Sequence, residues 1–244
     1  PGTFMGIDTG EAYRKAMREP EGQRPDSGEN ANVPHQDLEG FIYVPSTGLY
    51  VAKERTFHGK DWFDSHKLLQ QNGERMQTIL EFAEFLRHLR ENPSDENTKI
   101  YNDITEARSP WRAEWLDADF KVKNGELYIN SDHVYGNGNL IPKNSEILDE
   151  DTLMKDKTPG ISLDSWLDSP TSQGLPRKNT KKGEIYYWYP KDDNNSVAWF
   201  GAGSGGAGLG CGRYPSGWDP GLGVFAVAGA SNNARTNQGR NQDE

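Results

Sequence analysis

Residues 197–228 read VAWFGAGSGGAGLGCGRYPSGWDPGLGVFAVA, and this stretch decides the fold prediction. The runs Val197–Phe200 and Val224–Ala228 have the β-branched and aromatic residues typical of strands. Between them, residues 201–223 hold 10 of the 27 glycines in the chain. Glycine loses much backbone entropy on folding, so such a run needs a structural or functional reason. Because tyrosine, arginine and tryptophan accompany the glycines, we expect a binding surface displayed on loops between core strands.

Strand patterns also occur upstream of this segment. Residues 184–189 form an aromatic run, and two hairpins are predicted earlier in the chain. In the first, Phe41–Val44 and Leu49–Ala52 flank a Pro/Gly turn. In the second, Asp119–Lys123 and Glu126–Asn130 flank Asn124-Gly125, a dipeptide typical of tight hairpin turns.

Two helices are predicted between these hairpins. The first covers 62–71 with Asp61 as its N-cap, and the second covers 74–91 and ends at Asn92-Pro93. A short helix is also expected near Leu163–Leu167. The expected core comprises Phe41, Tyr43, Leu49, Val51, Trp62, Ile79, Leu80, Ala83, Tyr187, Val197, Trp199, Leu209, Val224 and Val227.

The chain divides into four stretches by composition. Residues 1–40 are polar and proline-containing and predict an extended or disordered arm. Residues 41–230 form the predicted domain, with loop insertions in about 93–183, a stretch that is polar and poor in strand or helix patterns. Residues 231–244 are rich in Asn, Gln and Arg and predict a flexible tail.

Composition excludes several classes of protein. The 244 residues carry a formal net charge of −10 and contain 7 Trp, 10 Tyr and 9 Phe, which favours a folded acidic domain over a disordered chain. No apolar run is long enough for a membrane span. An acidic chain without a basic block is a poor nucleic-acid binder. The single cysteine, Cys211, excludes a disulfide framework within the chain.

Motifs for cofactors, metals and nucleophiles are weak. Gly201-x-Gly203-x-x-Gly206 matches a dinucleotide fingerprint, but no helix or βαβ unit follows it. The five histidines show no pair at short ligand spacing, and Asp192–Asn195 fits a solvated turn better than a calcium loop. Cys211 has only Arg213 as a basic neighbour, which favours a buried thiol over a reactive one. We therefore expect no catalytic residues, no metal and no cofactor.

The end of the chain resembles the variable proteins of diversity-generating retroelements, which have a C-type lectin fold. The resemblance rests on Trp199-Phe200-Gly201-Ala202, on Ala207-Gly208-Leu209 and on Leu222-Gly223-Val224-Phe225-Ala226-Val227. It covers about 30 residues well, and members from archaeal viruses are the most similar kind. It implies an α+β, C-type lectin-like fold in which two helices pack on a small, mostly antiparallel sheet. The calcium-binding and disulfide motifs of sugar-binding lectins are missing.

The same resemblance makes a statement about residue types. In this family a reverse transcriptase substitutes at adenines, mostly in Asn codons, and such codons cannot become Lys, Glu, Gln, Met or Trp. These five types make up 51 of 244 residues, yet none occurs in Phe200–Gly217. Trp218 cannot arise in this way and is predicted to be framework.

The resemblance implies that the chain is not an enzyme but a receptor-binding viral protein whose hypervariable region, about 197–228, faces a ligand. Its partner would be a protein on a host cell, and its location a virion or cell surface. Single glycines could instead serve backbone turns. The diversified positions would be Gly203, Ser204, Gly205, Gly206, Gly210, Gly212, Arg213, Tyr214, Ser216, Gly217, Asp219, Pro220 and Gly221.

Two other functions remain open from the residues alone. A structural virion protein would bury residues 203–221 in a subunit contact. A hydrolase with an unrecognised carboxylate pair would have a concave acidic pocket.

Overall fold

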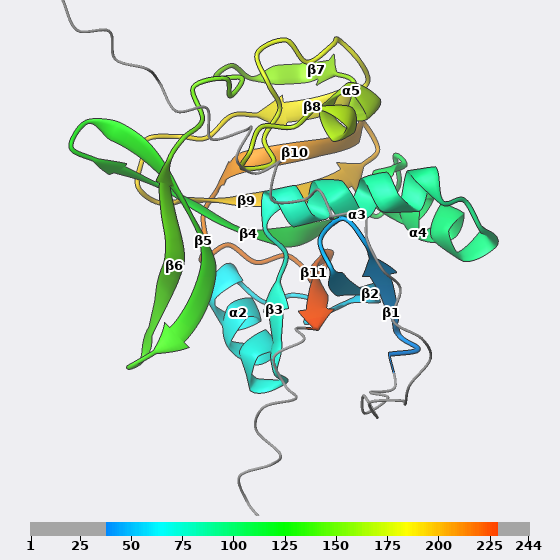
Figure 1. Cartoon of the computed structure of the whole chain (residues 1–244), viewed down its shortest axis with the longest axis horizontal. Helices are drawn as coiled ribbons and strands as arrows, with labels where there is room; N and C mark the ends of the chain where they lie inside the picture. The colour runs from blue at the N-terminus through cyan, green and yellow to red at the C-terminus, as the bar shows by residue number, and fades with distance from the viewer. Residues whose placement is uncertain (1–37, 229–244) are drawn as a thin grey trace, which may run out of the picture. The chain divides into compact units, whose positions relative to one another are not determined.

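The computed structural model describes residues 38–228 and has a mixed α+β fold built on one eleven-stranded sheet (Figure 1). Its central path runs β1-β2-β11-β4-β9-β10-β8-β7, while β3 pairs with β11 and the β5–β6 hairpin extends from β4. Only the pairs β4–β11 and β8–β10 are parallel. The strands are β1 (Phe41–Val44), β2 (Leu49–Thr56), β3 (Glu74–Met76), β4 (Arg112–Lys123), β5 (Glu126–Gly136), β6 (Asn139–Ile147), β7 (Lys157–Ile161), β8 (Ile185–Trp188), β9 (Ser196–Gly203), β10 (Gly206–Arg213) and β11 (Leu222–Ala228).

Four helices pack around this sheet in the described part of the chain. They are α2 (Trp62–Gln71), α3 (Ile79–Glu91), α4 (Asp95–Thr105) and α5 (Leu163–Asp168). The α+β class and the mostly antiparallel sheet are confirmed. The sheet is larger than the small one expected. The described residues form four helices rather than the two that the resemblance implied, because the predicted short helix α5 forms and the unpredicted α4 is added.

Local sequence signals predicted several elements correctly. The β1–β2 and β4–β5 hairpins form as expected, and Asn124 and Gly125 have the positive φ angles, 54° and 83°, that a tight hairpin turn requires. Asp61 caps α2, and α5 lies at the predicted place. The second helix begins later than predicted, because residues 74–76 pair with β11 as β3 and Thr78 then starts α3 with a capping box.

Residues 93–183 contain more regular structure than the loop-rich stretch expected around the predicted hairpin and short helix. This stretch contains α4, β4, β5, β6, β7 and α5. Strand β4 is buried along most of its length and lies between β9 and β11. Its buried residues include Arg112, Glu114 and Asp117, so it lacks the apolar pattern that identifies a central strand.

The glycine-rich segment also differs from the prediction. Residues 206–213 are not a loop but strand β10, which lies between β9 and β8. The connections on either side of this strand, residues 204–205 and 214–221, are the true loops. The binding surface must therefore be sought on the face of a sheet as well as on loops.

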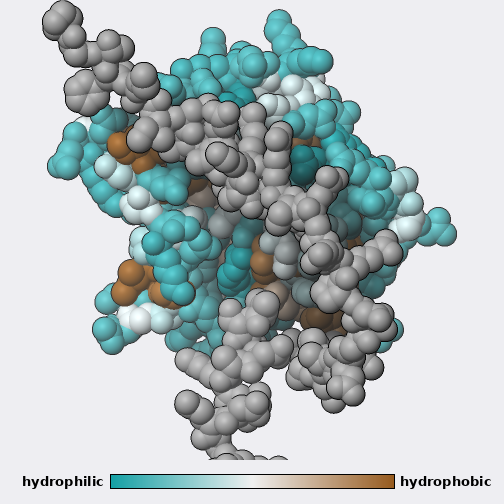
Figure 2. Space-filling model, viewed as in Figure 1, coloured by the Kyte–Doolittle hydropathy of each residue, from teal (hydrophilic) through white to brown (hydrophobic). Residues whose placement is uncertain are grey.

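Two apolar clusters lie on opposite faces of the sheet. The larger joins α3, α4 and α5 to Phe200, Leu209 and Cys211, and the smaller joins α2 to Trp115 and Val197. Nine of the predicted core residues are buried, whereas Phe41, Leu49, Leu80 and Trp199 are half-buried and Tyr43 is 47% exposed. The view in Figure 2 is largely hydrophilic where it is not grey, with a hydrophobic patch at the tip of the β5–β6 hairpin, where Ile141 is exposed.

Of the predicted arm over 1–40, only residues 38–40 are among the described residues. The predicted tail over 231–244 lies entirely outside them. Within the described range, no helix is long and apolar enough to cross a membrane.

A buried ion pair joins β2 to β4. Arg55 donates a hydrogen bond from Nη1 to Oε2 of Glu114 at 3.1 Å, while Oε1 of Glu114 is buried and has no hydrogen-bond partner among residues 38–228. Burial raises the pKa of Glu114 to about 7, although Arg55 acts in the opposite direction. The folded protein therefore holds a proton at Glu114 at pH values where the unfolded chain has released it.

This carboxyl predicts a pH dependence of stability. Because its pKa is higher in the folded state, its contribution is largest below the unfolded pKa of 4.5 and is lost as pH rises through about 7. The unfolding free energy of the wild type, measured relative to that of Glu114→Gln, should therefore fall between pH 5 and pH 8. Urea unfolding of both proteins between pH 5 and pH 8 tests this prediction. A difference in unfolding free energy between the two proteins that stays constant with pH would contradict it.

Candidate functional site

Strand β10 alternates between two kinds of residue. Ala207, Leu209 and Cys211 point into the larger apolar cluster, and the glycines between them lie on the other face of the sheet. The register of β10 against β9 shifts between Gly210 and Arg213. This bulge places Arg213 on the glycine side of the strand, among the aromatic rings described next.

Aromatic side chains from the neighbouring strands lie over these glycines. Gly210 pairs with Trp199 of β9 on one side and with Trp188 of β8 on the other. The two indole rings are 5.8 Å apart at 22° to each other, and Tyr186 stacks on Trp188 at 5.6 Å and 12°. Trp111 continues the row at 5.9 Å from Trp199. We call Tyr186, Trp188, Trp199, Trp111 and Arg213 the aromatic face.

Arg213 is the cationic member of the aromatic face. Its guanidinium carbon lies 5.4 Å, 5.5 Å and 5.8 Å from the ring centroids of Trp111, Trp115 and Trp199. It forms no salt bridge within residues 38–228, and its buried Nε has no hydrogen-bond partner there. Burial lowers the pKa of Arg213, with Asp219 acting against it. The geometry leaves a partly desolvated cation with unused hydrogen-bonding capacity.

An open pocket of about 300 Å³ lies at this place, lined by Trp188, Lys191, Trp199, Gly212 and Arg213. Lys191 is already paired with Asp156 at 3.2 Å and lies over the Tyr189 ring, so the cation that the pocket offers is Arg213. Arg213 and two indole faces make the pocket suited to a ligand group that is aromatic or anionic. Beside it, the loop 214–221 presents Tyr214 and Trp218, which are 62% and 66% exposed. Trp218 was predicted to be a framework residue, but its side chain is exposed rather than buried.

Of the predicted ligand-facing positions, all but Gly210 are exposed or half-buried. Several of them lie next to the aromatic face. A Cβ at Gly203 would lie 3.1 Å from Trp111, and one at Gly205 or Gly206 would lie 3.2 Å or 3.5 Å from Tyr186. The structure thus brings the β9–β10 turn and strand β10 together with aromatic residues that the sequence analysis did not assign to the site.

Two predicted positions have no room for a side chain. A Cβ at Gly210 would lie 2.3 Å from Nε1 of Trp199, and one at Gly221 would lie 2.3 Å from the carbonyl oxygen of Trp111. These glycines fit the alternative in which glycine serves packing. Asp219 also has a structural contact, because its Oδ1 accepts a hydrogen bond from the Gly221 N–H at 2.8 Å.

The other candidates from the sequence are accounted for by local structure. Cys211 is fully buried, and burial raises the pKa of its thiol, which disfavours reactivity. Asp193 accepts hydrogen bonds from Asn195 and Ser196 in an exposed turn before β9.

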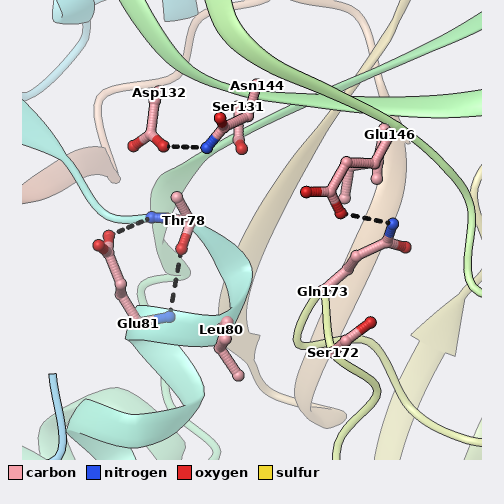
Figure 3. Close-up of a pocket in the computed structure, with 10 residues that line it drawn as sticks. Thr78, Leu80, Glu81, Ser131, Asp132, Asn144, Glu146, Ser172 and Gln173 are labelled. Carbon is pink, nitrogen blue, oxygen red and sulfur yellow. Dashed lines mark hydrogen bonds between the residues drawn. The ribbon is translucent and has the colours of Figure 1, made fainter. Parts of the chain in front are cut away.

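A second pocket, of about 210 Å³, lies between the start of α3, the β5–β6 hairpin and residues 172–173 (Figure 3). Three carboxylates line it, and each has a hydrogen-bond partner. Glu81 accepts bonds from Arg75 and from the Thr78 N–H, Asp132 accepts one from Asn144, and Glu146 accepts one from Gln173.

Sequence reasoning missed a buried cluster of two histidines and an aspartate. His66 of α2, Asp117 of β4 and His133 of β5 each offer a ligand atom, and these atoms lie within 4.8 Å of one another. Burial lowers the pKa of His66 to about 4. For His133, burial acts to lower the pKa, but the hydrogen bond to Asp117 and the nearby carboxylate of Asp119 raise it to about 9. The histidines are far apart in sequence, so spacing gave no sign of this cluster.

Comparisons of the chain with family models, with curated proteins and with solved structures find no match.

Two glycines of β10 provide a matched test of the aromatic face. Gly210→Ala should destabilise the protein by about 1–3 kcal/mol, because the new methyl group overlaps the Trp199 ring. Gly212→Ala lies on the same face but meets only the flexible Lys191 chain at 3.4 Å, so its effect should be within about 0.5 kcal/mol. Urea unfolding measures both, and equal effects at the two positions would contradict this packing.

Proposed function

We propose that this chain is a ligand-binding display protein with a C-type lectin-like fold, whose region of about 197–228 is diversified by a retroelement. The observation that carries the proposal is the division of β10 between two faces. One face is core, and the other bears glycines, Arg213 and a row of aromatic rings next to the predicted variable positions. Substitutions at the exposed positions of that second face, such as Gly212, can change a binding surface without touching the apolar cluster beneath it.

The chemistry of this face supports recognition of a protein partner. Tryptophan, tyrosine and arginine are the residues that contribute most to binding at protein interfaces. Here they project from paired strands, and stacking fixes the rings before a ligand arrives, which lowers the entropy cost of binding. The exposed Tyr214 and Trp218 on the adjoining loop enlarge the available area.

The proposed partner is a protein on the surface of a host cell, with the chain itself at a virion or cell surface. Several copies on one particle would bind with high avidity even if each site were weak. The hydrolase alternative gains little from the acidic pocket, because each of its carboxylates already accepts a hydrogen bond. The structural-protein alternative would require the aromatic face to be covered by another subunit.

The test uses two saturation libraries of the full chain displayed on yeast. One library varies the exposed positions Gly212, Tyr214 and Ser216, and the matched control library varies Gly208, Gly210 and Gly221, where a Cβ would lie within 2.7 Å of a neighbouring atom. Protease resistance reports folding. We expect most members of the first library and few of the second to remain folded.

Folded members of the first library are then incubated with surface proteins extracted from cells of the source community. The display function would be supported if the parent chain binds a surface protein and Tyr214 variants either lose this binding or bind a different protein. Loss of folding throughout the first library, or parental binding that no substitution in it alters, would overturn the proposal.

A further inference from the structure

The cluster of His66, Asp117 and His133 has a geometry that a buried hydrogen-bond network does not explain well. His133 Nδ1 lies 2.5 Å from Oδ1 of Asp117, and His66 Nε2 lies 3.6 Å from the same oxygen. Neither ring nitrogen of His66 has a hydrogen-bond partner among the described residues, although the side chain is 0% exposed. An unpartnered buried imidazole costs free energy, so its retention needs a reason.

The surroundings hold these groups in the orientation that a metal ion requires. Oδ2 of Asp117 accepts a hydrogen bond from the backbone N–H of His133 at 3.1 Å. The other oxygen, Oδ1, therefore faces the two imidazoles. The far nitrogen of His133, Nε2, lies 3.6 Å from Oδ1 of Asp119. A carboxylate behind a histidine is the arrangement that fixes the tautomer and orientation of metal-ligating imidazoles.

We infer that His66, Asp117 and His133 bind a divalent transition-metal ion of the zinc type. Two imidazole nitrogens and one carboxylate oxygen are the donor set that zinc accepts in proteins, with a fourth position left for another ligand. The ion would displace the proton between His133 and Asp117 and would supply the missing partner of His66. Trp62, whose ring lies 4.4 Å from His66 and 5.0 Å from His133, shields the site.

The consequence would be structural. The three ligands come from α2, β4 and β5, so one ion would join the helix on the second face of the sheet to the β4–β5 hairpin. Since the ion binds the folded state only, it would raise stability in proportion to the logarithm of its concentration. This inference does not depend on the proposed binding function, since the cluster shares no residue with the aromatic face.

The test uses the full chain, stripped of metal with a chelator and titrated with zinc alone. Calorimetry should show one zinc per chain. The melting temperature should rise by roughly 5 °C or more when free zinc is about 100 times its dissociation constant. Cobalt in place of zinc should give the visible absorption of a low-symmetry, four-coordinate site.

Two variants and a control separate this site from chance binding at surface histidines. His66→Leu should leave the metal-free melting temperature unchanged or higher, because the lost imidazole has no partner, and should abolish the zinc response. Asp119→Asn keeps all three ligands and should weaken zinc binding about 10- to 100-fold. His58→Ala removes an exposed histidine and should respond to zinc like the wild type.

The inference is overturned if the chain takes up no zinc at one equivalent. It is also overturned if His66→Leu retains the full zinc response. If His66→Leu does not fold, the deciding variant is Asp119→Asn, and zinc binding by this variant as tight as that of the wild type would overturn the inference.

Discussion

The aromatic face depends on the absence of a Cβ at two positions of β10. At Gly210 the ring of Trp199 occupies the space where a side chain would begin. At Gly208 that space is taken by Cβ and the carbonyl oxygen of Tyr186, with a ring atom of Trp188 at 3.0 Å. Because this strand lies between β9 and β8, aromatic residues of both neighbours can reach over it and stack. A larger residue at either position would separate the rings and open the face to water. Cross-strand packing of this kind accounts for a glycine-rich strand inside a sheet, where glycine is otherwise unfavourable.

The two faces of the sheet have different roles. One is covered by α3, α4 and α5 and holds most of the apolar core, including the alanine, leucine and cysteine that alternate with the glycines of β10. The other is covered by α2 only in part, where Trp62 packs over the histidine cluster, and it is open over β8, β9 and β10. The fold thus joins an apolar core to an open surface that we propose to be variable at its exposed positions. A metal ion bound by His66, Asp117 and His133, as inferred above, would strengthen the junction between α2 and the sheet.

Local patterns in the sequence predicted the parts of the fold that local physics determines. Asn124-Gly125 predicted the hairpin that β4 and β5 form, and the apolar spacing within 74–91 predicted a helix, of which residues 79–91 form α3. The alternation of glycine with apolar residues in 206–213 is a strand pattern, but glycine has no preference for either face, so the segment was predicted as loop. The first part of strand β4, residues 112–118, was missed because Arg112, Glu114 and Asp117 are buried by partners remote in sequence. The histidine cluster was invisible for the same reason, since only the topology brings α2, β4 and β5 together.

We propose that the exposed positions of the segment 197–228 vary while its buried positions do not. Deep sequencing of the coding segment for residues 197–228, with its flanking region, from the source population tests this proposal most directly. We expect substitutions confined to adenine positions of a nearby near-identical repeat. They should change exposed residues such as Gly212, Tyr214 and Ser216 and spare Leu209, Gly210 and Cys211, with a reverse-transcriptase frame close by. An invariant segment without a repeat, or variation that falls equally on exposed and buried positions, would contradict the proposal.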